Sequence, residues 1–251
     1  MMASSSSSNR VTLILCEGPD DVAFLKSLAI ARKLDTLPTW RGLQWYITRG
    51  SQAPIPPVKS ENVGAILDEA QYQKLRHELL SFITPTATRC EVRLFWLVDT
   101  DTFSHEHRIQ QIEETWQQLM RDLPPSLKVA SPQIACITPY LEALYTQALH
   151  EDVRTRLETA IHGWELAVEQ WLESLSTATT EATFHASTTN ATSTVFVRNL
   201  DKKRLQAYLM ALPFPYQQCK WSNPKAVQAL IDLQHPCFDA VAQAFSSFLK
   251  T

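Results

Sequence analysis

Two apolar runs that each end in acidic residues constrain the fold of this chain more than any other feature. Residues 11–21 read V-T-L-I-L-C-E-G-P-D-D, and residues 93–102 read R-L-F-W-L-V-D-T-D-T. Both runs are short, rich in β-branched or aromatic residues and apolar without alternation, which is typical of a strand covered on both faces in a parallel sheet. The sequence therefore predicts two buried parallel strands, each followed directly by acids.

Three of these acids stand where the two strands end. Ligands of an open α/β sheet bind outside the carboxyl ends of the strands, so Glu17, Asp99 and Asp101 meet in one crevice if the strands are neighbours. Carboxylates gathered in one place repel and lose hydration, which raises their pKa values unless a cation lies between them. Mg²⁺ fits such a site, and Mn²⁺ can substitute for it. We expect the three carboxyl groups to lie within roughly 4 to 8 Å of one another, the span that one or two hydrated ions bridge.

The rest of the first 150 residues continues an alternation of strand and helix. Apolar periodicity predicts a helix after Gly18, a strand over 43–48 closed by Gly50, a helix within 62–82, a helix over 109–123, and a strand over 133–138 followed by a helix that begins near Glu142. This alternation predicts an α/β fold in which a mostly parallel sheet carries helices on both faces. Gly18 and Gly50 stand at two strand ends, where either a close backbone approach to a ligand or an ordinary turn explains a glycine.

The chain divides into three parts by composition. Residues 1–10, rich in serine, read as a disordered tail, residues 11–150 as the α/β domain, and residues 151–251 as a helical C-terminal region. Within that region, a connector at 176–194 rich in Ser, Thr and Ala separates a helix that begins near residue 152 from helices predicted at 201–212, 224–233 and 237–249.

Composition limits the possible partners and the compartment. The formal net charge of −3 over 251 residues gives no global basic field, so a nucleic acid would have to be held locally or through a metal ion. Five cysteines form no C-x-x-C pair, which predicts reduced cysteines and a cytoplasmic protein. No apolar run reaches about 18 residues and no signal peptide is present, so we expect no membrane partner.

The strand, the E-G-x-D-D turn, the helix and the later D-x-D strand together resemble the Toprim domain of topoisomerases, primases, RecR-type repair proteins and OLD-family nucleases. The resemblance covers residues 11–149 and implies a Rossmann-like Toprim fold. It implies that Glu17 binds metal and acts as a general acid or base, and that Asp99 and Asp101 hold magnesium. Similarity to the OLD nucleases adds Asp21 and Glu142 as metal ligands.

The tail and two departures from the family pattern refine this interpretation. Small standalone Toprim proteins of bacteria and phages carry a lysine-led helical tail that resembles the segment starting at Lys202 and Lys203, which either contact phosphate or form a solvated helix face. The third acid of topoisomerases is missing, because Phe103 stands there. Neither a strand-passage tyrosine domain nor a zinc-binding primase module is found, which argues against topoisomerase and primase activity.

The resemblance therefore implies a Mg²⁺-dependent nuclease that hydrolyses phosphodiester bonds of DNA or RNA, in phage defence or nucleic-acid repair. Defence-associated relatives of this family often need an ATPase. The sequence has no Walker A loop, so such an ATPase would be a separate chain. A homo-oligomer is also compatible with the sequence. The acids Glu17, Asp99 and Asp101 are the predicted catalytic residues, with Gly18, Gly50, Lys202 and Lys203 as predicted substrate contacts.

The same residues are also compatible with structural roles and with two different functions. Asp21 and Glu142 fit ordinary first-turn helix acids, which the helix dipole stabilises, and His105 and His107 fit surface residues. A phosphatase of the haloacid dehalogenase type would use Asp99 as nucleophile and Asp101 as acid or base. In that family the motif normally ends the first strand, and here Thr102 replaces the expected glycine. A third alternative is a non-catalytic Toprim-like module that binds nucleic acid or a partner protein.

Overall fold

The computed structural model describes residues 9–48, 67, 69–83, 90–101, 103–155, 162, 166–167, 170, 205 and 220–250. The predictions made for Gly50, for Lys202 and Lys203, for the tail at 1–8 and for the connector at 176–194 lie outside these residues.

The described elements alternate between strand and helix as predicted. In chain order they are β1 (Asn9–Cys16), α1 (Pro19–Ala31), the 3-10 turns Leu34–Thr36 and Pro38–Gly42, β2 (Leu43–Ile47), α2 (Glu69–Ser81), β3 (Cys90–Asp99), α3 (His105–Asp122), β4 (Leu127–Val129), β5 (Gln133–Ile137), α4 (Leu141–Gln147), α7 (Pro224–Leu230), a 3-10 turn Pro236–Phe238, and α8 (Asp239–Lys250). The α/β fold class is confirmed, with a Rossmann-like parallel sheet. Among the described residues, no helix is both long and apolar enough to cross a membrane.

The sheet is parallel throughout the described residues, in the order β2-β1-β3-β4. Strand β5 also pairs with β3, so β4 covers the first part of β3 and β5 covers the last part up to Asp99. The sequence did not predict β4, because a strand of three residues is too short to show a periodicity.

Strands β1 and β3 are direct neighbours, and their register places Leu15 opposite Trp96. The chain leaves β1 toward β2 on one side and later returns to β3 on the other side. The order of strands therefore reverses between β1 and β3, and this reversal is where open α/β sheets form a crevice at their carboxyl edge. The predicted adjacency of the two acid-terminated strands is confirmed.

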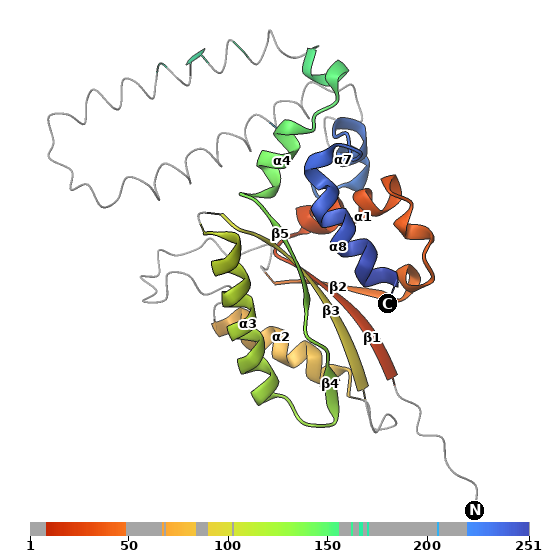
Figure 1. The fold of residues 1–251 in the computed structure, drawn as a ribbon, viewed down its shortest axis with the longest axis vertical. Coiled ribbons are helices and arrows are strands. Elements are labelled where there is room, and N and C mark those ends of the chain that lie inside the picture. The colour runs from red at the N-terminus through yellow and green to blue at the C-terminus, as the bar shows by residue number, and fades with distance from the viewer. Residues whose placement is uncertain are drawn as a thin grey trace, which may run out of the picture.

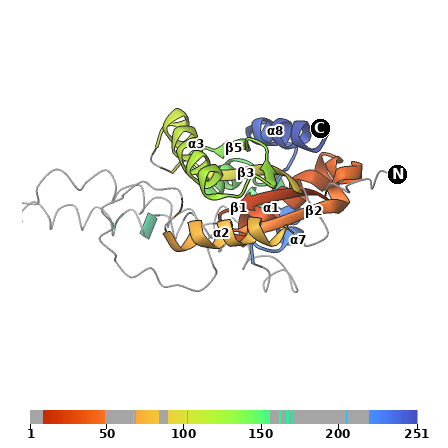
Figure 2. The same ribbon diagram turned by 90° about the horizontal axis from the view of Figure 1, so that it is seen from below.

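Helices cover both faces of the sheet, as expected for strands that are apolar without alternation. Residues Ile14, Cys16, Phe95 and Leu97 pack into one core with α1, α4, α7 and α8. Residues Leu13, Leu15, Leu94 and Trp96 pack into the other core with α2 and α3. Figure 1 shows these two groups of helices on either side of the strands, and Figure 2 shows α2 and α8 on opposite sides of them.

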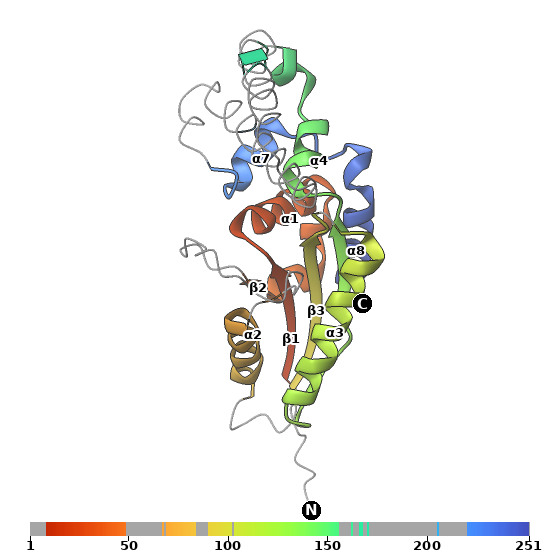
Figure 3. The same ribbon diagram turned by 90° about the vertical axis from the view of Figure 1, so that its left-hand side faces the viewer.

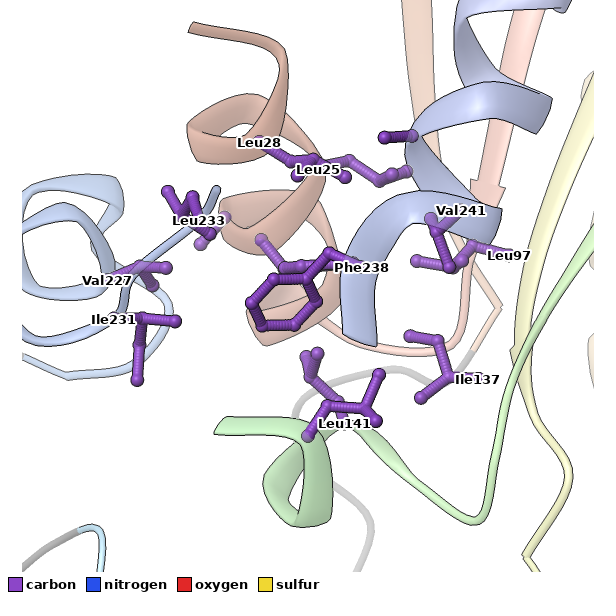
Figure 4. Close-up of a cluster of buried hydrophobic side chains, with 14 of the residues drawn as sticks. Leu25, Leu28, Leu97, Ile137, Leu141, Val227, Ile231, Leu233, Phe238 and Val241 are labelled. Carbon is purple, nitrogen blue, oxygen red and sulfur yellow. The ribbon is translucent and has the colours of Figure 1, made fainter. Parts of the chain in front are cut away.

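Helices α7 and α8, near the end of the chain, complete the first of these cores. Phe238 is fully buried there, and Figure 4 shows its ring between side chains of α1, α7 and the sheet. Burial of one such aromatic ring contributes about 2 to 3 kcal/mol to stability. The Ser27 hydroxyl on α1 also donates to the Pro224 carbonyl oxygen at 3.1 Å. These segments therefore pack on the sheet itself, and a domain boundary near residue 150 stays a prediction.

Candidate acidic site

The turn between β1 and α1 places the first two predicted acids. Gly18 is the N-cap of α1 and Pro19 occupies the first turn, where a missing N–H costs nothing. The Gly18 N–H donates to Asp21 Oδ2 at 2.8 Å, so Asp21 caps the start of its own helix. Asp21 therefore has a structural role as a capping acid in addition to any function.

Among the described residues, neither the backbone nor a neighbouring atom requires a glycine at position 18. Its φ is −142°, an extended backbone that any residue adopts. A Cβ added there would lie 4.0 Å from Asp21 Oδ2, an ordinary contact. A role of Gly18 in substrate binding stays a prediction.

The turn after β3 places the D-x-D pair. The N–H groups of Thr100 and Asp101 donate to the carbonyl oxygens of Ile137 and Pro139 at 2.8 and 2.7 Å, so this turn is fixed against the end of β5. Asp101 has a φ of 51°, in the left-handed region that aspartate tolerates better than most residues. This backbone turns the chain away from the sheet immediately after Asp99.

Glu17 and Asp99 are in direct contact at the reversal of strand order. The Asp99 backbone N–H donates to Glu17 Oε1 at 3.3 Å, and Asp99 is 5% exposed. The parallel register of β1 and β3 produces this contact, because each strand ends at the same edge of the sheet. Figure 3 shows the turn into α1 and helix α4 at this same edge.

The predicted second pair, Asp21 and Glu142, is close enough to interact electrostatically. The pKa of Asp21 is raised to about 7, and burial is the largest cause. The charges of Glu17, Asp20 and Glu142 add to the rise, whereas the hydrogen bond from the Gly18 N–H opposes it. Glu142 lies in the first turn of α4 and is half-buried. Acids from β1, α1 and α4 therefore share one region of negative potential.

Asp101 lies at the same edge but has a cationic partner. Its Oδ2 lies 3.3 Å from Arg108 Nη2, and Arg108 also donates to the Thr100 carbonyl oxygen at 3.4 Å. The two side chains are 24% and 7% exposed, so this is an ion pair largely removed from water. Asp101 is therefore compensated by the protein, whereas the charges acting on Asp21 add to its own.

Two residues of this region were missed by sequence reasoning. Arg108 stands near the positive end of α3, where a basic residue opposes the helix dipole, and that position could have indicated an acidic partner. Tyr145 follows Glu142 by three residues on the same helix face. Its buried hydroxyl makes no hydrogen bond within the described part of the chain, and burial, then Asp21, Asp20 and Glu142, raise its pKa. It is a neutral phenol beside the acids.

The donor chemistry of the site suits a hard divalent cation. All the candidate side chains are carboxylates, and oxygen ligands are the ones that Mg²⁺ and Mn²⁺ prefer. No group of three or more His, Cys, Asp or Glu within the described ranges is arranged so that it could hold one metal ion. Mg²⁺ is commonly bound by one or two carboxylates together with water and substrate oxygens. Glu17 and Asp99, linked by the hydrogen bond from the Asp99 backbone N–H to Glu17 Oε1, match that number.

The structure thus brings Glu17 and Asp99 into contact and places Asp21 and Glu142 within electrostatic reach of each other. Asp101 lies at the same edge in an ion pair with Arg108. The predicted spacing of roughly 4 to 8 Å between all three catalytic carboxyl groups stays a prediction. Comparisons of the chain with protein-family models, with curated proteins and with solved structures each gave no match.

Proposed function

We propose that this protein is a divalent-metal-dependent nuclease that hydrolyses phosphodiester bonds at the carboxyl edge of β1 and β3. The proposal includes the finer fold assignment, a Toprim-like domain over residues 11–150 with a helical C-terminal region. Its partners are DNA or RNA, and its cofactor is Mg²⁺ or Mn²⁺.

One observation carries the proposal. Glu17 and Asp99 end two neighbouring parallel strands at the reversal of strand order, and a hydrogen bond joins them. Acids that end neighbouring strands at this point lie where α/β proteins bind ligands. Burial, with smaller contributions from the charges of Glu17, Asp20 and Glu142, raises the pKa of Asp21, which supports a site that favours positive charge.

The acidic residues of the site have different roles in this proposal. Glu17 and Asp99 are the principal carboxylates that would hold the ion, with Asp21, Asp101 and Glu142 as the surrounding acids. A bound Mg²⁺ supplies charge stabilisation at the phosphate and a more acidic water. The Asp99 N–H orients Glu17 toward the crevice, and Asp21, with a pKa of about 7, can hold or release a proton near neutral pH.

The test is an incubation of the purified full chain with labelled DNA and RNA, single and double stranded, in Mg²⁺, Mn²⁺ or EDTA. We expect cleavage that requires Mg²⁺ or Mn²⁺ and that disappears in Glu17→Gln. Glutamine keeps an oxygen that can accept the Asp99 N–H, so the variant removes the charge with little change in shape.

The outcome distinguishes the alternatives. Cleavage that persists in EDTA would remove the proposed mechanism. Release of phosphate from small phosphomonoesters, without cleavage of nucleic acids, would favour the phosphatase alternative. Binding with neither activity would favour a non-catalytic module.

A further inference from the structure

Two aromatic rings stack on each other at the start of α3. The rings of Phe103 and His107 have centroids 5.2 Å apart and planes 25° apart. Phe103 is half-buried and His107 is exposed. The Gln111 amide lies 3.2 Å from His107 Nε2, a contact that holds the imidazole in place. The pair therefore presents an aromatic surface to solvent through its exposed member, His107.

This ring pair lies beside the acidic edge. The Arg108 guanidinium carbon is 4.7 Å from the centre of the Phe103 ring, and its Nη2 is 3.3 Å from Asp101 Oδ2. The Phe103 N–H also donates to the Thr100 carbonyl oxygen at 3.0 Å. A single guanidinium therefore contacts both the aromatic surface and the last acid of the D-x-D pair.

Local structure explains Phe103 but not His107. Phe103 directly precedes the N-cap Ser104, and its contact with Arg108 resembles the contact across a helix start that fixes the entry of the chain. His107 adds an exposed ring on top of that contact, and an exposed histidine contributes little to helix stability. The stack therefore provides more aromatic surface than capping requires.

We propose that the Phe103–His107 stack is a platform for one unpaired nucleobase of the strand whose phosphate occupies the acidic edge. This inference rests on the proposed nuclease function and deepens it by naming the substrate as single-stranded DNA or RNA, including frayed ends. A base within an intact duplex has both faces covered by its neighbours, so only an unpaired base can stack here. Stacking on an aromatic ring is sequence-tolerant and requires no positive charge, which matters for a chain of net charge −3.

The experiment measures binding separately from cleavage. Fluorescence anisotropy of a labelled single-stranded oligonucleotide, as DNA and as RNA, is compared with that of the matching duplex, with Ca²⁺ in place of Mg²⁺. The variants are His107→Ala, which removes the exposed ring, and Phe103→Leu, which keeps an apolar contact at the helix start. His105→Ala is the matched control, an exposed histidine two residues earlier on the same helix.

We expect wild-type protein to bind the single strand more tightly than the duplex. His107→Ala and Phe103→Leu should each weaken single-strand binding by about 5- to 100-fold, with the midpoint of urea unfolding unchanged for His107→Ala. His105→Ala should bind as wild type does. The DNA and RNA arms identify which strand the platform accepts.

Two results would overturn the inference, and both differ from a failure of the proposed function. Equal affinity of wild type and His107→Ala for the single strand, or tighter binding of the duplex, removes the platform even if the enzyme cleaves nucleic acids. Ring-dependent binding of single strands without any cleavage in Mg²⁺ or Mn²⁺ would instead retain the base platform and remove the nuclease.

Discussion

The two strand-to-helix turns at the carboxyl edge each contain an aspartate that is largely removed from water, but the charges around the two aspartates differ in sign. After β1, burial raises the pKa of Asp21 to about 7, with smaller contributions from the charges of Glu17, Asp20 and Glu142. After β3, Asp101 lies 3.3 Å from a buried arginine. Both turns follow a buried strand and lead into a helix, so the order of elements alone does not explain the difference.

The difference is that Asp101 pairs with Arg108, whereas the neighbouring acids add to the rise in the pKa of Asp21. A carboxylate with a built-in guanidinium partner gains less from a metal ion, because the ion must compete with that partner. Acids that repel one another gain more, because the ion relieves the repulsion. The comparison therefore favours Glu17 and Asp21 as acids of the proposed metal site and gives Asp101 a share in holding the turn after β3. Asp99 joins the site for a different reason, because its backbone N–H donates to Glu17 Oε1.

The largest effect is expected from neutralising Glu17 or Asp99, the two acids that a hydrogen bond links across the turns. Glu17→Gln and Asp99→Asn should each lower the rate of Mg²⁺-dependent cleavage by more than about 100-fold, because the ion would lose one of its two nearest anionic ligands. Initial rates on a labelled oligonucleotide measure this. Glu91→Gln, at a half-buried acid that lies at the opposite end of β3 and pairs with Arg10, is the matched control and should retain activity. If both edge variants retain more than half of the activity, the site lies elsewhere.

The compensated turn should respond through stability. Arg108→Met leaves Asp101 partly buried without its cation, and we expect a loss of about 2 to 4 kcal/mol in the free energy of unfolding at pH 7. Urea denaturation measures the loss. Adding Asp101→Asn to Arg108→Met should recover a large part of it, because the buried charge is then removed. A single-variant loss under about 0.5 kcal/mol would mean that the pair behaves as an exposed salt bridge.

The sequence was sufficient to predict the approach of Glu17 to Asp99 because that approach depends on strand neighbours alone. Uninterrupted apolar runs identified β1 and β3 as buried strands, and the shared edge of parallel strands placed Glu17 next to Asp99. The resemblance to the OLD nucleases added Asp21 and Glu142 to the same site, and the two are within electrostatic reach of each other in the structure. These inferences needed no knowledge of side-chain orientation.

The compensated turn could not be predicted in the same way. The Asp101–Arg108 pair depends on a left-handed backbone at Asp101 and on hydrogen bonds of that turn to Pro139 and Ile137, which follow from tertiary contacts with β5. The packing of α7 and α8 was hidden for a similar reason. An amphipathic pattern shows that a helix buries one face, but not that Phe238 would pack against α1, more than 200 residues earlier in the chain.

A smaller effect is expected when the repulsion at the β1 turn is removed. The pKa of Asp21 is about 7 when folded, above its ordinary value of 3.8, so the folded state keeps a proton that the unfolded chain releases. Stability therefore falls as pH rises from about 4 to about 7, and the loss persists above pH 7. Asp21→Asn should abolish that pH dependence in EDTA and stabilise the protein by about 1 to 3 kcal/mol at pH 8.

Asparagine is chosen because its side-chain oxygen can still accept the Gly18 N–H, whereas alanine would also remove the cap. Urea unfolding at pH 5, 6, 7 and 8 measures the effect. Asp152→Asn serves as the control, since Asp152 is an exposed acid in a helical first turn and should change stability by less than about 1 kcal/mol without this pH window. A destabilised Asp21→Asn at pH 8 would show that Asp21 acts only as a helix-capping acid.

The smallest effect is the stabilisation of the folded protein by the cation itself. This effect compares the two turns most directly. An ion that binds only the folded state adds about 1 kcal/mol when its free concentration is several times the dissociation constant. We expect Mg²⁺ to raise the melting temperature of wild type relative to NaCl of the same ionic strength, and we expect Glu17→Gln and Asp99→Asn to lose that gain. Asp101→Asn should keep most of it, because Arg108 already neutralises Asp101 before the ion arrives. Loss of the whole gain in Asp101→Asn would mean that the ion displaces Arg108. A wild-type melting temperature unaffected by Mg²⁺ and Mn²⁺ would contradict a cation site at the carboxyl edge.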